Sequence, residues 1–284
     1  MLELDRVARR SGEQGTCQDV TFTVRHGEVV GLAGTGTTAV LRLAAGLLEP
    51  DAGQVRRSGA RVGYLPAEGG LYPRMRVLDQ LVYVARLHGA DVYEALRDAE
   101  LWAARFGLRD RRGDRVRQLA PRERARLRLA AVLTPNPDLL VLDDPYAGLD
   151  QATADLLTSM LRERAAGGAK VLVACADLDV VARLCDRAVV LHNGRVVAEG
   201  AVGELLAAAR QELLVDVPSA PPDWAAVLPG VTVLAVHNGL FRLALAPGTD
   251  DQAVLTAALA TGPVHGFTRI PPRLADLFDV VTAG

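Results

Sequence analysis

The sequence predicts an α/β fold with a mostly parallel sheet, followed by a small α+β unit at its C-terminal end. Three observations support this prediction. A glycine-rich stretch at 31–38 lies between a strand-like run and a helix-like run. The predicted strand 138–142, which is apolar after Asp138, is followed by two adjacent carboxylates, Asp143 and Asp144. Apolar strands and amphipathic helices then alternate, which is typical of a parallel sheet covered on both faces.

The composition narrows the class of protein. A chain of 284 residues, half of them hydrophobic, can bury the core of one large or two modest domains. The net charge of −2 gives no overall attraction to nucleic acid, which we do not expect as a partner. The three cysteines have no metal-binding spacing, and no apolar run approaches the roughly 20 residues that span a bilayer. We expect a cytoplasmic protein that reaches the membrane only through a partner.

The elements of the first unit follow from apolar periodicity. The sequence predicts strands at 2–4, 20–24, 61–65, 138–142, 170–174 and 187–191, and helices at 39–46, 77–88 and 93–106. A highly charged run at 109–117 precedes Arg122, Arg124, Arg126 and Arg128. We interpret these alternating arginines as the solvated face of a helix rather than as a nucleic-acid patch.

The C-terminal part has its own pattern. Strands are predicted at 212–217, 231–237, 240–246 and 264–270, and helices at 223–228, 250–260 and 273–281. The pair Asn238-Gly239 between two alternating strands is a strong hairpin signal. The order β-α-β-β-α-β is ferredoxin-like. We therefore expect a first domain at 1–210, with a helical subdomain at about 74–135, and an accessory domain at 211–284.

The glycine-rich stretch has the character of a phosphate-binding loop. Between a strand and a helix, such a loop directs backbone N–H groups and a helix N-terminus toward phosphate. The P-loop pattern G-x-x-x-x-G-K-[ST] can be anchored at Gly31 and Gly36, which puts Thr38 at the Mg²⁺-binding hydroxyl. Thr37 then occupies the lysine position, and the only lysine of the chain is Lys170. The candidate nucleotide-binding residues are Gly31, Gly34, Gly36, Thr37 and Thr38.

Several motifs in this order resemble the ATP-binding subunit of an ABC transporter, most closely the bacterial branch associated with sodium, drug or antibiotic export. The resemblance covers about 1–203 and includes the segments 27–32, 43–53 and 183–187, while 272–278 is similar to the close of that branch's tail. It implies a P-loop NTPase-like ABC ATPase domain with a helical subdomain.

The resemblance also implies a chemistry and partners. The expected ligands are ATP and Mg²⁺, with Thr38 and Asp143 at the metal and Asp144 at the position of the water-activating carboxylate. The expected partners are a membrane-spanning permease subunit, contacted through Leu71, Tyr72 and Met75, and a second ATP-binding subunit, identical or different. The protein would then sit at the inner face of the membrane.

Most positions that touch nucleotide in the family are changed. When the family motif is aligned separately from the strand before the loop and from the helix after it, the P-loop is about three residues shorter than in the family. Its lysine is also missing. Losing one group that stabilises transition-state charge typically costs roughly 3–4 kcal/mol. The further departures are Ser11 for the adenine-stacking aromatic, Ala67 for the Q-loop residue, 119–123 (Leu-Ala-Pro-Arg-Glu) for the Leu-Ser-x-Gly-Gln type signature, and Ala176 for the switch histidine.

Three hypotheses remain open at this point. The first is a subunit that docks on a transporter with impaired or lost ATP hydrolysis. The second is a slow but functional transport ATPase, in which Arg42 is the nearest candidate to replace the lysine. The third is a non-transport scaffold that uses the helices and the tail for interactions.

Overall fold

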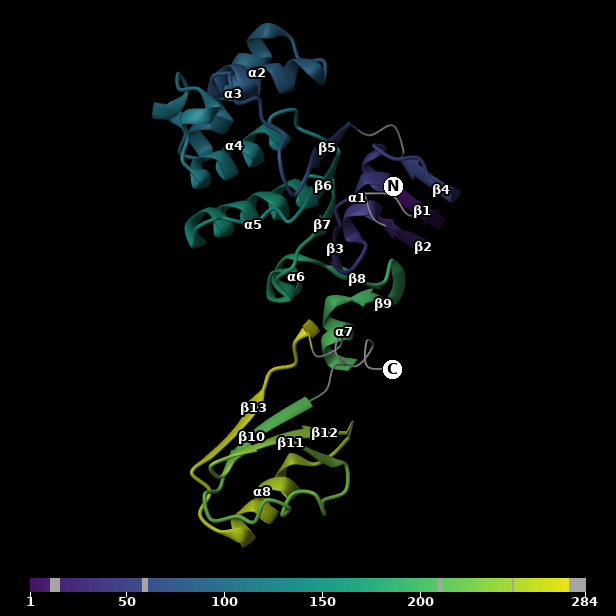
Figure 1. Ribbon diagram of the computed structural model, residues 1–284, viewed down its shortest axis with the longest axis vertical. Helices are drawn as coiled ribbons and strands as arrows, with labels where there is room; N and C mark the ends of the chain where they lie inside the picture. Colours follow the sequence, from purple (N-terminus) through teal and green to yellow (C-terminus); the bar gives the residue numbers. More distant parts are fainter. Residues whose placement is uncertain (11–15, 58–60, 209–210, 247, 276–284) are drawn as a thin grey trace. The chain divides into compact units, whose positions relative to one another are not determined.

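The computed structural model describes residues 1–10, 16–57, 61–208, 211–246 and 248–275. The chain divides into two compact units, Met1–Val202 and Gly203–Gly284 (Figure 1), and each is described by itself. Ser11 lies outside the described residues. In the part that is described, no helix is both long enough and apolar enough to cross a membrane.

A six-stranded sheet organises the first unit. Its order is β5 (Val62–Leu65), β6 (Leu139–Asp143), β7 (Lys170–Ala174), β3 (Val29–Gly34), β8 (Arg187–His192) and β9 (Arg195–Ala201). The first five strands are parallel and β9 is antiparallel. Every residue of β6 and β7 is buried, as expected for central strands covered on both faces. The predicted α/β class with a mostly parallel sheet is confirmed.

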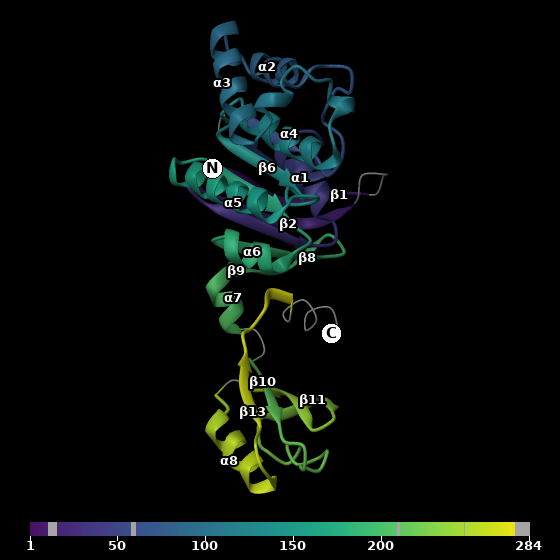
Figure 2. The ribbon, with the colours of Figure 1, turned by 90° about the vertical axis from the view of Figure 1, so that its left-hand side faces the viewer.

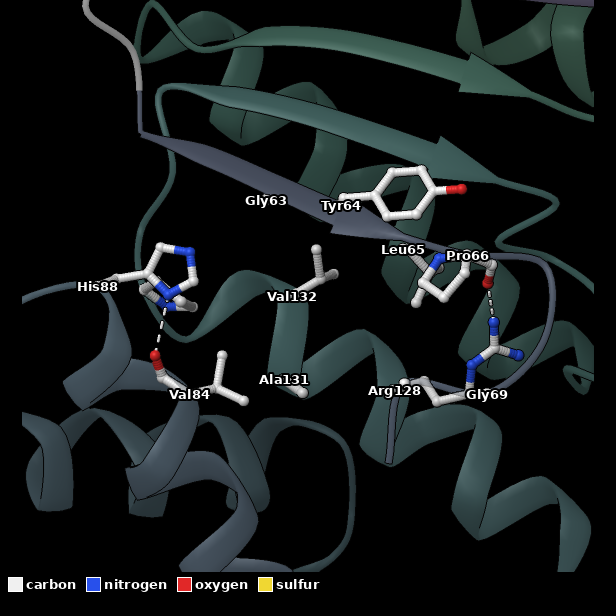
Figure 3. A pocket seen from close by; sticks show the side chains of 12 residues that line it. Gly63, Tyr64, Leu65, Pro66, Gly69, Val84, His88, Arg128, Ala131 and Val132 are labelled. Carbon is white, nitrogen blue, oxygen red and sulfur yellow. Dashed lines mark hydrogen bonds between the residues drawn. The ribbon is translucent and has the colours of Figure 1, made fainter. Parts of the chain in front are cut away.

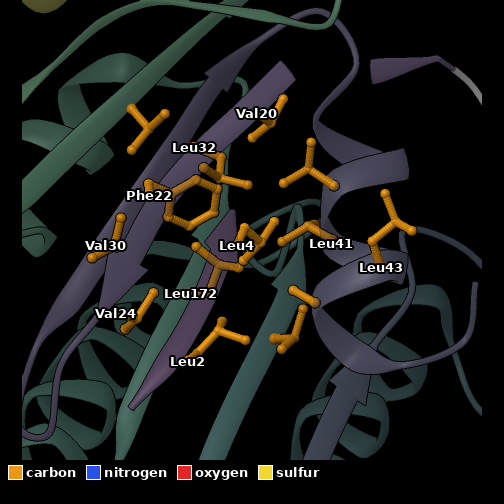
Figure 4. Close-up of a cluster of buried hydrophobic side chains, with 14 of the residues drawn as sticks. Leu2, Leu4, Val20, Phe22, Val24, Val30, Leu32, Leu41, Leu43 and Leu172 are labelled. Atoms are coloured by element: carbon orange, nitrogen blue, oxygen red, sulfur yellow. The ribbon is translucent and has the colours of Figure 1, made fainter. Parts of the chain in front are cut away.

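A second, antiparallel sheet packs beside the first helix. It contains β2 (Cys17–Val24), β1 (Leu2–Arg9) and β4 (Ala52–Arg57). The sequence did not predict β4, because most of its side chains are polar or exposed. Side chains of β1 and β2 meet those of α1 (Thr37–Ala45) and of the parallel sheet in one buried cluster (Figure 4).

The helices of this unit begin and end close to the predicted residues. An insertion between β5 and β6 carries α2 (Val77–Leu87), α3 (Val92–Arg105) and α4 (Pro121–Leu133), which lie together in Figure 2. Two short 3₁₀ turns, Arg109–Arg111 and Val116–Gln118, precede α4. Asp91 caps α3 by accepting hydrogen bonds from the N–H groups of Tyr93 and Glu94. The other described helices of this unit are α5 (Gln151–Ala166) and α6 (Leu178–Leu184), while α7 (Val202–Ala208) starts at the last residue of the first unit and continues into the second.

Among its described residues, the C-terminal unit contains a four-stranded antiparallel sheet and a helix that follows the third strand. Its order is β11 (Val231–His237), β12 (Leu240–Leu245), β10 (Gln211–Asp216) and β13 (Gly266–Ile270), with α8 at Asp251–Thr261. Asn238 and Gly239 both have positive φ, 48° and 82°, as the predicted hairpin turn requires. The helix expected at 223–228 is wrong, since this segment forms turns. Prolines precede it and Pro229-Gly230 follows, which leaves too few residues for a stable helix. The helix expected at 273–281 lies largely outside the described residues.

The packing of α1 predicts how a substitution in this helix changes the stability of the first unit. Leu41 is fully buried, so Leu41→Ala should lower the free energy of unfolding by about 2–5 kcal/mol. Leu47, just after the same helix, is 58% exposed and serves as the control, with an expected change within about 0.5 kcal/mol for Leu47→Ala. Urea unfolding followed by circular dichroism measures both. Equal losses for the two variants would contradict the assigned core.

Candidate functional site

The connection between β3 and α1 is only two residues long. Strand β3 ends at Gly34 and α1 begins at Thr37, so Thr35 and Gly36 make the whole turn. Gly34 and Gly36 have φ values of 97° and 95°, a left-handed conformation that favours glycine. Gly31 and Gly34, which were expected to belong to the phosphate-binding loop, are therefore part of the strand.

Thr35 is bound to the β8–β9 turn through its backbone and its side chain. Its N–H donates to the carbonyl of Leu191 (3.1 Å), and its own carbonyl accepts from the N–H of Gly194 (3.1 Å). The hydroxyl of Thr35 accepts from the N–H of Asn193 (2.7 Å). Both backbone hydrogen-bonding groups of Thr35 are thus already satisfied within the chain.

Gly36 packs directly against backbone on one side. A Cβ at this position would lie 2.9 Å from the Cα of Gly194 and 2.9 Å from the carbonyl oxygen of Thr16. Only glycine fits there without a shift of the neighbouring chain. The turn is therefore held between two other segments of the protein.

The other candidate residues of the loop fall in different surroundings. Gly31 is buried within β3, where a Cβ would lie 2.6 Å from Val181 Cγ1 on α6, so it is a packing position of the sheet. Gly34 is exposed, and Thr37 and Thr38 are half-buried in the first turn of α1. No side chain caps α1 and no acidic residue lies in its first turn. The N–H groups there keep the partial positive charge of a helix N-terminus.

Asp143 is a buried carboxylate at the end of β6. It is 5% exposed, and among the described residues its Oδ2 atom has no hydrogen-bond partner. Burial raises the pKa of Asp143; the hydroxyl of Thr38 opposes this shift, as do the positive charges of Arg42 and Arg128, while Asp144 adds to it. The structure thus brings together Thr38 and Asp143, the two residues that the resemblance placed at the metal.

Asp144 adopts a left-handed backbone, with a φ of 46°. Its N–H donates to the carbonyl of Ala174 (2.9 Å), and its Oδ1 lies 4.0 Å from the thiol of Cys175. Burial raises the pKa of Cys175 to about 11, so this thiol stays protonated near neutral pH. In the described part of the chain, no group of three or more His, Cys, Asp or Glu side chains could hold a metal by itself.

Arg128 is a residue of this region whose position the sequence analysis missed. From α4 it donates to the carbonyl oxygens of Pro66 and Ala67, beside a small pocket of about 100 Å³ between β5, α2 and α4 (Figure 3). Arg126, two residues earlier, is paired with Asp150 (2.6 Å). The interpretation of these arginines as a purely solvated face is wrong at both positions, because the contacts come from distant segments.

The start of α4, where the signature motif was aligned, is closed by an acidic side chain. The helix begins at Pro121, which has no N–H, and Glu123 accepts a hydrogen bond from the N–H of Ala120 (2.8 Å). Glu123 is also paired with Arg111 (3.0 Å). A carboxylate therefore lies in the first turn of α4, where it accepts from Ala120 and pairs with Arg111.

The effect of packing around Gly36 on stability can be separated experimentally from the effect of its backbone conformation. Gly36→Ala adds a Cβ against backbone at a φ of 95°, whereas Gly89→Ala has nearly the same φ, 92°, with nothing within 4 Å. We expect Gly89→Ala to cost about 1 kcal/mol and Gly36→Ala about 2 kcal/mol or more. Chemical unfolding of both variants measures the difference, and equal costs would show that the turn is not packed as described.

The buried carboxylate of Asp143 predicts a pH-dependent stability. Because folding raises the pKa of Asp143, its ionised form destabilises the native state at neutral pH and this penalty disappears below about pH 4. Asp143→Asn should therefore raise the free energy of unfolding by about 1 kcal/mol at pH 7 and leave it unchanged at pH 3. Asp110→Asn, at an exposed aspartate, is the control. A loss of stability at pH 7 in Asp143→Asn would contradict this account.

Comparison with known proteins places these features in a family. The family model described as ABC transporter matches residues 17–147. Nod factor export ATP-binding protein I of Burkholderia orbicola is 31% identical over 293 residues, covering 98% of this chain and 95% of that protein. ABC transporter ATP-binding protein NatA of Bacillus subtilis is 31% identical over 210 residues, covering 69% of this chain and 85% of its own.

Solved structures agree with this assignment. The ATP-binding subunit of an ABC transporter superposes with a TM-score of 0.68 at 26% identity, covering 73% of this chain and 92% of that chain. The ATP-binding cassette MJ0796, in a post-hydrolysis dimer bound to ADP and Pi, gives a TM-score of 0.65 at 21% identity over 71% of this chain and 99% of its own, and so shows the fold alone. The identity, the coverage and the shared fold together show that the chain belongs to the family of ABC transporter ATP-binding subunits.

Proposed function

We propose that this chain serves as the ATP-binding-type subunit of a bacterial export-type ABC transporter in which its own ATP hydrolysis is impaired or lost. It would dock on a membrane-spanning permease and pair with a second ATP-binding subunit. The relatives named for Nod factor export support the export assignment. The main observation that supports the proposed loss of hydrolysis is the two-residue turn at Thr35-Gly36, which is hydrogen-bonded to the β8–β9 turn.

A triphosphate needs several backbone N–H groups that converge on it. Here the N–H of Thr35 is bonded to Leu191, and the space beside Gly36 is filled by Thr16 and Gly194. The lysine that would neutralise phosphate charge is absent, and Lys170 is buried in β7. The residues present do not fit a tightly held Mg-ATP, and no hydrolytic step is assigned to them.

The second half of a shared site is also altered. In the family, the start of the signature helix faces the nucleotide held by the partner subunit. In this chain, Ala120 has no hydroxyl, Pro121 has no N–H and Glu123 brings negative charge to that helix end. In a homodimer, both shared sites would lack the P-loop groups and the signature groups. With a competent partner, one site would lack the P-loop groups of this chain, and the other site would lack its signature groups.

A second candidate is a slow but functional ATPase, and one observation favours it. The buried Oδ2 of Asp143 has no partner among the described residues, and the hydroxyl of Thr38 lies beside this carboxylate. Hydroxyl and carboxylate oxygens are ligands that Mg²⁺ accepts. A metal-bound nucleotide at the uncapped start of α1 would satisfy both Asp143 and the helix N-terminus.

Steady-state assays of the purified full chain separate the two candidates. For the impaired subunit we expect turnover well below about 1 s⁻¹ with Mg-ATP, and no saturable binding of a fluorescent ATP analogue in the micromolar range. Asp143→Asn and the exposed control Asp110→Asn should then behave alike. Saturable binding that Asp143→Asn abolishes and Asp110→Asn keeps would favour the slow ATPase, and turnover near 1 s⁻¹ or faster would overturn the proposal.

A further inference from the structure

The C-terminal unit has the strand connections of a ferredoxin-like domain in which turns replace the first helix. Its sheet order is β11-β12-β10-β13, and α8 connects β12 to β13, whereas the segment 218–230 between β10 and β11 forms turns. Trp224 and Ala225 from these turns belong to the same buried cluster as Val254 and Ala258 of α8. The face of the sheet beside α8 is therefore covered by a turn segment rather than by a second helix.

A hollow of about 460 Å³ lies where this turn segment meets the start of α8. Leu228 and Val231 line it on one side, and Ala253 and Val254 line it on the other. Val254 also belongs to the buried core of the unit, so the apolar floor of the hollow is continuous with that core. A volume of this size is within the range that holds small organic molecules.

The two walls of the hollow are joined by hydrogen bonds at Gly230. The carbonyl of Gly230 accepts from the N–H of Ala246 (2.8 Å) and from the hydroxyl of Thr249 (3.3 Å). Gly230 has a φ of 75°, and a Cβ there would collide with the hydroxyl of Thr249, so this position requires glycine. The N–H of Val231 donates to the carbonyl of Leu228 (3.2 Å). The hollow therefore has a shape that backbone contacts fix.

Among the described residues that line the hollow, Asp250 is the charged one. One oxygen of its exposed carboxylate accepts from the N–H of Gln252 (2.9 Å), and Asp250 forms no ion pair within the described part of the chain. Thr249 already uses its hydroxyl hydrogen on Gly230, so its oxygen can only accept. The polar side-chain atoms at this rim are thus acceptors beside an apolar surface.

This arrangement selects against an anion. A helix N-terminus ordinarily attracts negative charge. At α8, however, the carboxylate of Asp250 already caps the helix, and Asp251 adds a second carboxylate in the first turn, paired with Arg269 (2.6 Å). A bound anion would meet both acidic side chains, whereas an ammonium group would donate to the free oxygen of Asp250 and to Thr249.

We propose that this hollow binds a small amphipathic organic cation. Its ammonium group lies at Asp250 and Thr249, and its apolar body lies against Leu228, Val231 and Val254. Burial of the apolar body supplies most of the affinity, and the charge-assisted hydrogen bond to Asp250 sets the orientation and the preference for a cation. The site belongs to the C-terminal unit by itself, so it depends neither on nucleotide nor on the proposed function of the first unit.

Three probes with the same apolar body and different charge test the ligand class. They are phenylbutylamine, which is protonated at neutral pH, phenylbutanol and phenylbutyrate. Calorimetric titration of the full chain at about 50 mM salt should give saturable binding of the amine with a Kd of about 1 mM or below. The amine should bind about three- to fivefold more tightly than the alcohol, and the carboxylate more weakly than both.

Two pairs of variants test the location. Asp250→Asn keeps a good N-cap, so it should weaken the amine about three- to fivefold and leave the alcohol within about twofold. Asp91→Asn, at the N-cap of α3, is the matched control and should change neither. Ala253→Phe should fill the hollow and weaken the amine and the alcohol by about tenfold or more, whereas Ala260→Phe, at an exposed position of the same helix outside the lining, should not. Circular dichroism verifies that each variant is folded.

Several results would overturn the proposal. One is the absence of saturable binding of the amine at up to about 5 mM. Another is equal or tighter binding of the carboxylate, which would assign the start of α8 to anions instead. A third is unchanged affinity for the amine in folded Ala253→Phe, which would place the bound probe elsewhere on the chain. An equal loss of amine and alcohol binding in Asp250→Asn would exclude the assigned charge pairing.

Discussion

The first unit depends on the attachment of the β3–α1 turn to the β8–β9 turn. Three hydrogen bonds join Thr35 to Leu191, Asn193 and Gly194, and Gly36 is in close backbone contact with the same hairpin. This attachment fixes the end of the central strand and the start of α1. It also satisfies both backbone hydrogen-bonding groups of Thr35 within the chain.

A second feature of this region is the pair of carboxylates, Asp143 and Asp144, at the end of β6. Asp143 remains buried beside Thr38 with one unpartnered oxygen, and burial raises its pKa. A buried charge without a partner costs stability, and such costs concentrate at functional sites. The Asp143 carboxylate and the Thr38 hydroxyl therefore lie next to a turn that is hydrogen-bonded to another segment of the chain.

Arginine side chains have different structural roles in the insertion between β5 and β6. Arg128 binds the carbonyl groups that follow β5, and Arg126 binds Asp150 at the start of α5, so both tie α4 to the core. Arg76 and Arg115, on the segments that precede α2 and α4, instead face each other across an antiparallel bridge.

Much of this protein could be predicted from sequence. The strands of the parallel sheet and helices α2 and α3 follow from apolar periodicity, since burial on one or both faces imposes that pattern. The hairpin at Asn238-Gly239 follows from the turn conformation that these residues favour. Motif spacing gave the role expected for Thr38, and the family resemblance gave those of Asp143 and Asp144; these three roles stay predictions. In contrast, the expected helix at 223–228 failed because flanking prolines and tertiary packing outweighed its local pattern.

Contacts between segments far apart in the chain became clear only from the tertiary structure. Periodicity cannot show that Thr35 bonds to residues near 193, that Gly31 packs under α6, or that Arg128 reaches the carbonyl of Ala67. These contacts depend on which loops the sheet order brings side by side, and local sequence carries no record of that order. The family fold and the absence of a lysine from 31–38 can be established from the sequence alone, whereas the contacts of Thr35 and Gly36 with the β8–β9 turn depend on the three-dimensional packing.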